Sequence, residues 1–150
     1  MTTTTADDQA IAERSVADLY STDHASQALG MRIVSVAPGE CSVTMTVRKD
    51  MTNGHGTCHG GMLFTLADSA FAFACNSFGA ATVAASASID FLTAAREGDV
   101  LTARGQALWS GGRSGIYEIT ITNQNGARVA LFRGRSHRIG EPRVSGQESP

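Results

Sequence analysis

The sequence lacks the features that mark several common classes of protein. It has three cysteines, an odd number without the paired short spacings of a zinc ribbon or a redox motif. No basic region followed by an apolar stretch opens the chain, and no window approaches the run of about 18 apolar residues that a membrane span needs. The net charge of -2 gives no overall attraction to nucleic acid or to an anionic membrane. We therefore expect a soluble cytoplasmic protein with reduced thiols and with no nucleic-acid or membrane partner.

Length and composition favour one folded domain. The chain has 150 residues, of which 42% are hydrophobic and 17% charged, as in ordinary globular proteins. Residues 1–5 form a polar tail, and residues 140–150 are expected to be disordered. We therefore treat 1–150 as a single domain with flexible ends.

The order of the expected elements indicates an α+β fold. Apolar spacing predicts a first helix over 6–21, and alternation predicts a hairpin of strands 31–37 and 41–48 around Pro38-Gly39. A glycine-rich loop, 49–61, leads into a central helix over about 58–77. Four strands follow, over 82–92, 100–109, 116–123 and 127–137. Asn125-Gly126 predicts a two-residue turn between the last two strands. Without βαβ alternation, this order implies an antiparallel sheet with the long helix on one face.

One carboxylate in the central helix is unexpected. Asp68 is the only formally charged residue between Asp50 and Asp90, and its helical neighbours Phe64, Phe71 and Cys75 offer no cation. Burying an unpaired carboxylate costs several kcal/mol or shifts its pKa, so Asp68 is a candidate catalytic group. The alternative is that it caps a neighbouring loop or pairs with an arginine elsewhere in the fold.

The loop before this helix predicts a site for a negative oxygen. It ends in Gly60-Gly61, which allow a ligand to approach the backbone, and the unpaired amides and dipole of a helix start favour an anion. The alternative is that these are ordinary loop glycines. Gly60 and Asp68 are eight positions apart, or about 12 Å along one helix. Two copies packed antiparallel about a two-fold axis would bring them together, so we predict a homodimer with two shared active sites.

The sequence resembles the hotdog-fold acyl-CoA thioesterases of the phenylacetate-degradation (PaaI) family. The likeness covers about residues 24–140. The resemblance therefore implies a single hotdog thioesterase domain whose core is this segment. The segments that carry it are NGHGTCHGG at 53–61, LADSAFAFACNS at 66–77, SIDFL at 88–92 and ALFRGRSHRIG at 130–140.

The resemblance implies both a fold and a chemistry. It implies a sheet wrapped around the central helix, subunits joined through their sheets, and dimers associating into a tetramer. It implies that Asp68 is general base or nucleophile and that the Gly60 amide binds the thioester oxygen. His59 and Asn53 would orient substrate and water, and Ser69 would assist. The implied substrates are aromatic acyl-CoA thioesters such as phenylacetyl-CoA or its hydroxylated forms, and no cofactor is implied.

Arginines are candidates for the phosphates of coenzyme A. Arg113 lies in the glycine-rich turn, and Arg133, Arg135 and Arg138 lie near the last strand. The alternative is that they are solvated residues that protect a sheet edge.

Other kinds of site fit the sequence less well. His55, Cys58 and His59 match no common zinc-ligand spacing, so we expect no metal. No Gly-x-Ser-x-Gly elbow is present, which argues against a serine hydrolase. A hydratase on the same fold usually has a paired aspartate and histidine in one short loop, and the order here differs. The main alternative function is a non-catalytic hotdog module that binds acyl-CoA.

Overall fold

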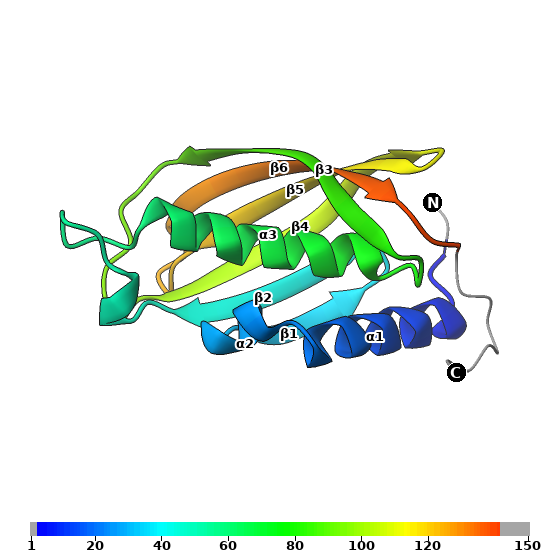
Figure 1. The fold of residues 1–150 in the computed structure, drawn as a ribbon, viewed down its shortest axis with the longest axis horizontal. Helices are drawn as coiled ribbons and strands as arrows, with labels where there is room; N and C mark the ends of the chain where they lie inside the picture. The colour runs from blue at the N-terminus through cyan, green and yellow to red at the C-terminus, as the bar shows by residue number, and fades with distance from the viewer. Residues whose placement is uncertain (1–2, 142–150) are drawn as a thin grey trace.

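The structure, a computed structural model, describes residues 3–141 and confirms the α+β architecture. A curved, six-stranded antiparallel sheet wraps around one long helix, and a second helix lies along the open side (Figure 1). Of the two ends expected to be flexible, 1–2 and 142–150 lie outside the described residues. No helix in 3–141 is long and apolar enough to cross a membrane.

The elements follow the predicted order with a few additions. The helices are α1 (Ala6–Ser21), α2 (His24–Ala28) and α3 (Gly60–Asn76), with a 3-10 turn η1 (Lys49–Met51). The strands are β1 (Arg32–Ala37), β2 (Glu40–Thr46), β3 (Thr82–Phe91), β4 (Val100–Gly111), β5 (Ser114–Thr122) and β6 (Arg128–Arg138). The strand order in the sheet is β1-β2-β4-β5-β6-β3.

The central helix packs closely on the concave face of the sheet. Leu66, Phe71 and Phe73 of α3 are buried among inward-facing strand residues such as Ile119 and Phe132. Glycines in the sheet allow this approach. A Cβ at Gly134 would lie 2.7 Å from the Phe71 ring, and one at Gly105 would lie 3.3 Å from the Ala70 carbonyl oxygen. The sheet therefore fixes the position of α3 along most of its length.

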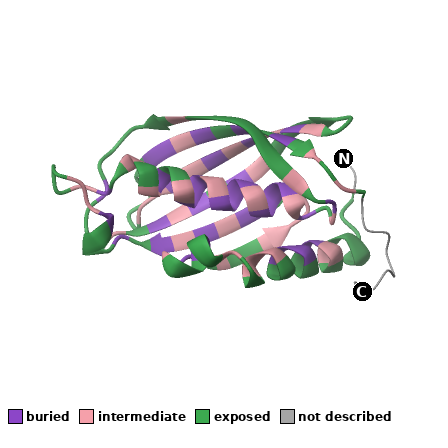
Figure 2. Ribbon diagram, viewed as in Figure 1, coloured by how far each residue is buried: buried purple, intermediate pink, exposed green. Residues whose placement is uncertain are grey.

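The two edges of the sheet differ. At the β1 edge, the side chain of Gln9 in α1 donates a hydrogen bond of 2.8 Å to the carbonyl of Val36. Strand β3, at the opposite edge, pairs with β6 and with no other strand among residues 3–141, and it is exposed along most of its length (Figure 2). No charged residue lies on β3 before Asp90, although natural sheets usually protect a free edge with charge. The β3 edge is therefore open to a partner.

Local details differ from the sequence prediction. Helix α2 and the turn η1 were not expected, because five and three residues are too few to show a hydrophobic period. The Asn125-Gly126 prediction of a two-residue turn was wrong: the Asn123 side chain accepts the amides of Asn125 and Ala127, which holds a five-residue loop over 123–127. The two-residue turns of the sheet are instead Pro38-Gly39, between β1 and β2 as predicted, and Gly112-Arg113, between β4 and β5.

Candidate active site

Helix α3 begins with an amide that is free to bind a ligand. The ring Nδ1 of His59, the N-cap residue, accepts the Gly61 amide at 2.9 Å. No described residue accepts a hydrogen bond from the Gly60 amide. Since Nδ1 is an acceptor, neutral His59 carries its proton on Nε2 and can donate outward. The helix start therefore offers a backbone and a side-chain donor in a region of positive dipole.

Little space surrounds Gly60. A Cβ added there would lie 3.1 Å from Cζ of Phe91, whose ring covers the start of the helix from the end of β3. The sequence did not point to Phe91, because the contact joins segments that are 31 positions apart. The ring leaves room for a ligand at the Gly60 amide only if residue 60 has no side chain.

Asn53 holds the loop before α3. Its side-chain oxygen accepts hydrogen bonds from the amides of His55 and Thr57 and from the Thr57 hydroxyl. With its oxygen used in this way, the Nδ2 group of Asn53 remains as a donor without a described partner. Asn53, His59 and Gly60 therefore lie at the same end of α3, as the sequence predicted.

Asp68 lies two turns along α3, on a stripe of the helix that is only partly covered: Phe64 is exposed, and Thr65 and Ala72 are half-buried. Its side chain is half-buried, and no described residue forms a hydrogen bond or an ion pair with its carboxylate. Burial raises the pKa of Asp68, and the negative charge of Asp23 raises it further. The expected alternatives, a loop cap or an arginine partner, are therefore absent from 3–141. An unpaired carboxylate with a raised pKa in such a place is typical of a catalytic base.

Ser69 turns away from this open stripe. It is buried, and its hydroxyl lies 2.8 Å from the hydroxyl of Ser26 in α2. The chain thus separates its candidate residues into two groups. Asn53, His59 and Gly60 lie at the start of α3, and Asp68 and Ser69 lie eight and nine positions further along.

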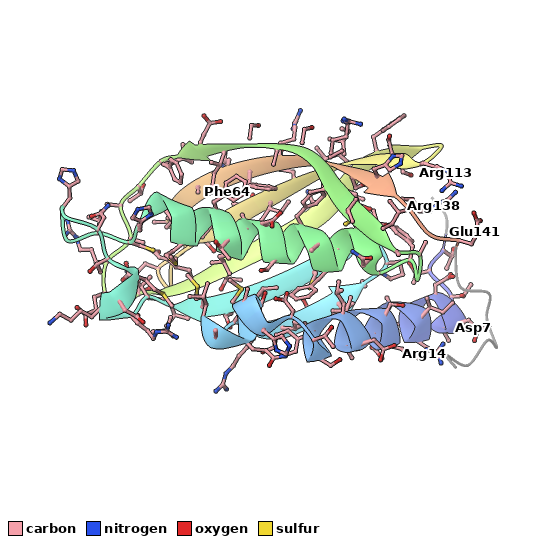
Figure 3. All side chains as sticks on the ribbon, in the orientation of Figure 1. Asp7, Arg14, Phe64, Arg113, Arg138 and Glu141 are labelled. Atoms are coloured by element: carbon pink, nitrogen blue, oxygen red, sulfur yellow. The ribbon has the colours of Figure 1, made fainter. Side chains whose placement is uncertain are left out.

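The open stripe of α3 is apolar beside Asp68. Phe64, one turn earlier, is 37% exposed, and one edge of its ring contacts Phe132 of β6 with 5.2 Å between the ring centroids. Figure 3 shows Phe64 on the side of α3 that faces β6 and β3. Phe64 and Asp68 therefore lie on an incompletely covered stripe of α3.

A cavity of about 290 Å³ lies at the other end of α3. Cys75, Phe78 and Tyr117 form part of its wall. Cys75 lies on the same helical stripe as Asp68, about 10 Å further along. Burial raises the pKa of the Cys75 thiol to about 12 and also raises the pKa of Tyr117, so both groups are neutral at physiological pH. The Tyr117 hydroxyl has no hydrogen-bond partner among the described residues.

The candidate arginines do not gather at one place in the chain. Arg113, in the hairpin turn at the end of the sheet away from Gly60, pairs with Glu141 at 3.3 Å (Figure 3). Arg133 and Arg135 alternate with the buried residues Phe132, Gly134 and Ser136, so they lie on the outer face of the sheet. Arg133 lies 3.6 Å from Glu118, whereas Arg135 has no described acidic partner. Their role in binding coenzyme A stays a prediction.

The described residues contain no cluster of three or more histidine, cysteine or acidic side chains that would hold a metal ion. Cys41, Cys58 and Cys75 are buried and form no disulfide. Burial is the main cause of the raised pKa of each thiol. Packing, rather than nucleophilic chemistry, is the role that these surroundings support.

Comparison with known proteins places the chain in a family. The model of the thioesterase superfamily matches residues 55–130. The chain is 53% identical to acyl-coenzyme A thioesterase PaaI of Escherichia coli (strain K12) over 122 residues, which are 81% of this chain and 87% of that protein. The solved structure of E. coli PaaI, from the phenylacetic acid degradation operon, superposes with a TM-score of 0.87 at 49% identity, covering 89% of this chain and 97% of that one. A hypothetical thioesterase of Streptococcus pneumoniae, solved with coenzyme A, is 31% identical. It superposes with a TM-score of 0.73, and the match covers 75% of this chain and 91% of that one.

Proposed function

The chain belongs to the thioesterase superfamily, and from that premise we propose that it hydrolyses acyl-coenzyme A thioesters to the free acid and coenzyme A. Aromatic substrates such as phenylacetyl-coenzyme A are favoured by its 53% identity to PaaI. Two observations carry the proposal: Asp68 is half-buried and has no described partner, and the Gly60 amide at the start of the same helix is free.

Each group supplies one part of the minimum chemistry. As water adds to the thioester carbon, the carbonyl oxygen becomes negative, and the Gly60 amide stabilises it. Ionised Asp68 takes a proton from the water, or attacks the carbon itself to give a mixed anhydride that water then hydrolyses. The C–S bond breaks, and the sulfur leaves as the thiolate of coenzyme A. It becomes the thiol by taking the proton that Asp68 removed from water, or a proton from solvent in the anhydride route. In this proposal, the Nε2 proton of His59 and the Nδ2 group of Asn53 orient substrate and water.

These groups form a complete site only in a dimer. Gly60 and Asp68 are about 12 Å apart along α3, too far to act on one carbon. We propose that two chains pair through their β3 edges, so that the start of each α3 lies beside the middle of the other. The open β3 edge and the partly exposed Phe64 support this arrangement. We further propose, from the family resemblance alone, that two such dimers form a tetramer.

Arg135 is the strongest of the proposed contacts for the phosphates of coenzyme A. Arg113 and Arg133 each have a carboxylate partner, whereas the guanidinium of Arg135 has none among the described residues. A free guanidinium binds phosphate through two parallel hydrogen bonds. A cytoplasmic location is also proposed, and the three cysteines without disulfides support it.

The proposed activity predicts release of thiol from acyl-coenzyme A. Purified protein should hydrolyse phenylacetyl-coenzyme A and its hydroxylated forms, with free thiol appearing in step with free acid. Acetyl-coenzyme A serves as a matched substrate without a ring, and we expect a lower kcat/KM for it, because it leaves the apolar surface beside Asp68 uncovered. If the protein binds these thioesters and releases no thiol from any of them, the alternative of a non-catalytic binding module is correct.

A further inference from the structure

The cavity at the far end of α3 holds polar groups that the proposed reaction does not use. Its volume of about 290 Å³ is at the small end of the range for ligand pockets. Cys75, Phe78 and the ring of Tyr117 give it apolar walls. None of the described residues that line it is acidic, and two are arginines, Arg113 and Arg138, which lie at the same end of the molecule (Figure 3). The cavity therefore combines apolar surface with positive charge.

Arg138 differs from the other arginines of β6 because it faces into the protein. Positions 132, 134 and 136 of the strand are buried and positions 133 and 135 are exposed, so the two-residue period places 138 on the inward face. The Nε atom of Arg138 is buried without a hydrogen-bond partner, and no other atom of its guanidinium bonds to a residue in 3–141. A partly buried cation without an acceptor is unfavourable, so an anion in the cavity would be stabilised beside it.

Tyr117 and Ser136 bring hydroxyl groups to the same cavity. Tyr117 is 3% exposed, and burial raises its pKa, so the unpartnered phenol keeps its proton and can donate it. The hydroxyl of Ser136 donates a hydrogen bond of 3.4 Å to the carbonyl of Gly115, which is longer than usual for two oxygens. A Cβ at Gly115 would lie 2.9 Å from Oγ of Ser136 and 2.9 Å from Cε2 of Tyr117. The glycine therefore keeps the space between the two side chains open.

The end of α3 beside the cavity opposes an anion only weakly. The carbonyls in the last turn of a helix carry partial negative charge. Those of Ala72 and Ala74 already accept hydrogen bonds from the side chains of Asn76 and Ser77, at 2.8 Å and 2.6 Å. The charge at the cavity is thus set by the arginines of the sheet.

We propose that this cavity is a binding site for a small organic carboxylate with an apolar body, the class to which phenylacetate belongs. A carboxylate accepts two parallel hydrogen bonds from a guanidinium, here Arg138, and a further one from the phenol of Tyr117. The apolar body lies against Phe78 and Cys75. The site is separate from the proposed active site, because Cys75 lies about 10 Å beyond Asp68 along α3. The acid released by a thioesterase belongs to the same class of ligand.

The chain contains its own reporter for this site, since it has two tyrosines and one of them lines the cavity. Protein labelled with 3-fluorotyrosine should give two ¹⁹F NMR signals, which Tyr117→Phe assigns. The hydroxyl of Tyr20 donates to the carbonyl of Met31 at 2.7 Å, so the Tyr20 signal is an internal control. Titration with phenylacetate should shift the Tyr117 signal along a saturable curve and leave the Tyr20 signal in place.

Two variants test the role of the guanidinium. Arg138→Met removes the charge and keeps an apolar stem, and it should weaken the binding of phenylacetate at Tyr117 by about tenfold or more. Arg14→Met is the matched control, because Arg14 is exposed on α1 and does not line the cavity (Figure 3). It should keep the wild-type Kd. Circular dichroism shows whether each variant is folded.

Three other compounds test the ligand class. We expect 2-phenylethanol, which keeps the ring without the charge, and inorganic phosphate, which keeps charge without the ring, each to bind about tenfold more weakly than phenylacetate or worse. Coenzyme A tests whether the arginines bind its phosphates instead.

A saturable shift of the Tyr117 signal with phenylacetate, weakened in Arg138→Met and not in Arg14→Met, supports the proposal. No shift, an equal Kd for 2-phenylethanol, or an unchanged Kd in Arg138→Met overturns it. A shift with coenzyme A or phosphate and none with phenylacetate would make the cavity a phosphate site. The titration needs no turnover, and Asp68→Asn should give the wild-type Kd, so its outcome is separate from that of the thiol-release assay.

Discussion

Asp68→Asn is expected to lower kcat by about 10³-fold, because asparagine can neither take a proton from water nor attack the thioester carbon. The change is nearly isosteric and breaks no hydrogen bond or ion pair within 3–141, so the fold and the assembly should persist. Thiol release from phenylacetyl-coenzyme A gives the rate, and size-exclusion chromatography with light scattering gives the assembly. Asp7→Asn, which removes an equal charge from the exposed start of α1, should keep the wild-type rate. An Asp68→Asn protein that remains fully active would rule out this residue as the base.

The same variant should be at least as stable as the wild type. The pKa of Asp68 is raised in the fold above its ordinary value of 3.8, so the folded state binds more protons than the unfolded state between those two pKa values. The free energy of unfolding of the wild type therefore falls as the pH rises through that window, and the Asn variant lacks this loss. Thermal melts at pH 4 and pH 7 would detect this loss of stability in the wild type. The Tm difference between the two proteins should be larger at pH 7 than at pH 4. A catalytic group that costs stability is common in enzymes.

Ala87→Lys is expected to produce a folded monomer whose activity is lower by about 10²-fold or more, because each site would lose the oxyanion donor supplied by the partner chain. Ala87 lies in the middle of the exposed β3 strand, so lysine has room in the single chain. In the dimer, two ammonium groups would meet near the two-fold axis. Light scattering gives the mass, and circular dichroism tests the fold.

The matched control for that variant is Val34→Lys. Val34 is 63% exposed on β1, at the opposite edge of the sheet, so the added charge is the same and the β3 edge is left intact. It should remain dimeric and active. A monomeric Ala87→Lys protein with full activity would mean that each chain holds a complete site. An Ala87→Lys protein that is still dimeric would show that the interface does not lie at the β3 edge.

The sequence predicted the parts of this fold that rest on long patterns. Helix α3 was expected over 58–77 and lies at Gly60–Asn76, because a long apolar run between glycines has few other solutions. Asp68 was found for a related reason: a lone charge in that run needs an explanation that its neighbours do not provide. Both inferences use residues close together in the chain.

Contacts between distant segments could not be read in this way. The bond from Ser26 to Ser69 spans 43 positions, and α2 is too short to have shown a hydrophobic period. The arginines are a different case. Alternation along β6 places Arg133 and Arg135 on the face opposite Phe132, so the two-residue period of a strand is enough to separate them from Arg113 in the hairpin turn.

The claim that one active site takes Asp68 from one chain and Gly60 from its partner is tested most directly by mixing two inactive proteins. One carries Asp68→Asn. The other carries Gly60→Val, whose side chain would meet the Phe91 ring and cover the amide. In the heterodimer, one site combines two altered residues, and the other combines wild-type Asp68 with wild-type Gly60. Purified heterodimers, selected with two different affinity tags, should therefore recover about half of the wild-type activity. Heterodimers that form and show no activity above that of the parent proteins would contradict the shared site.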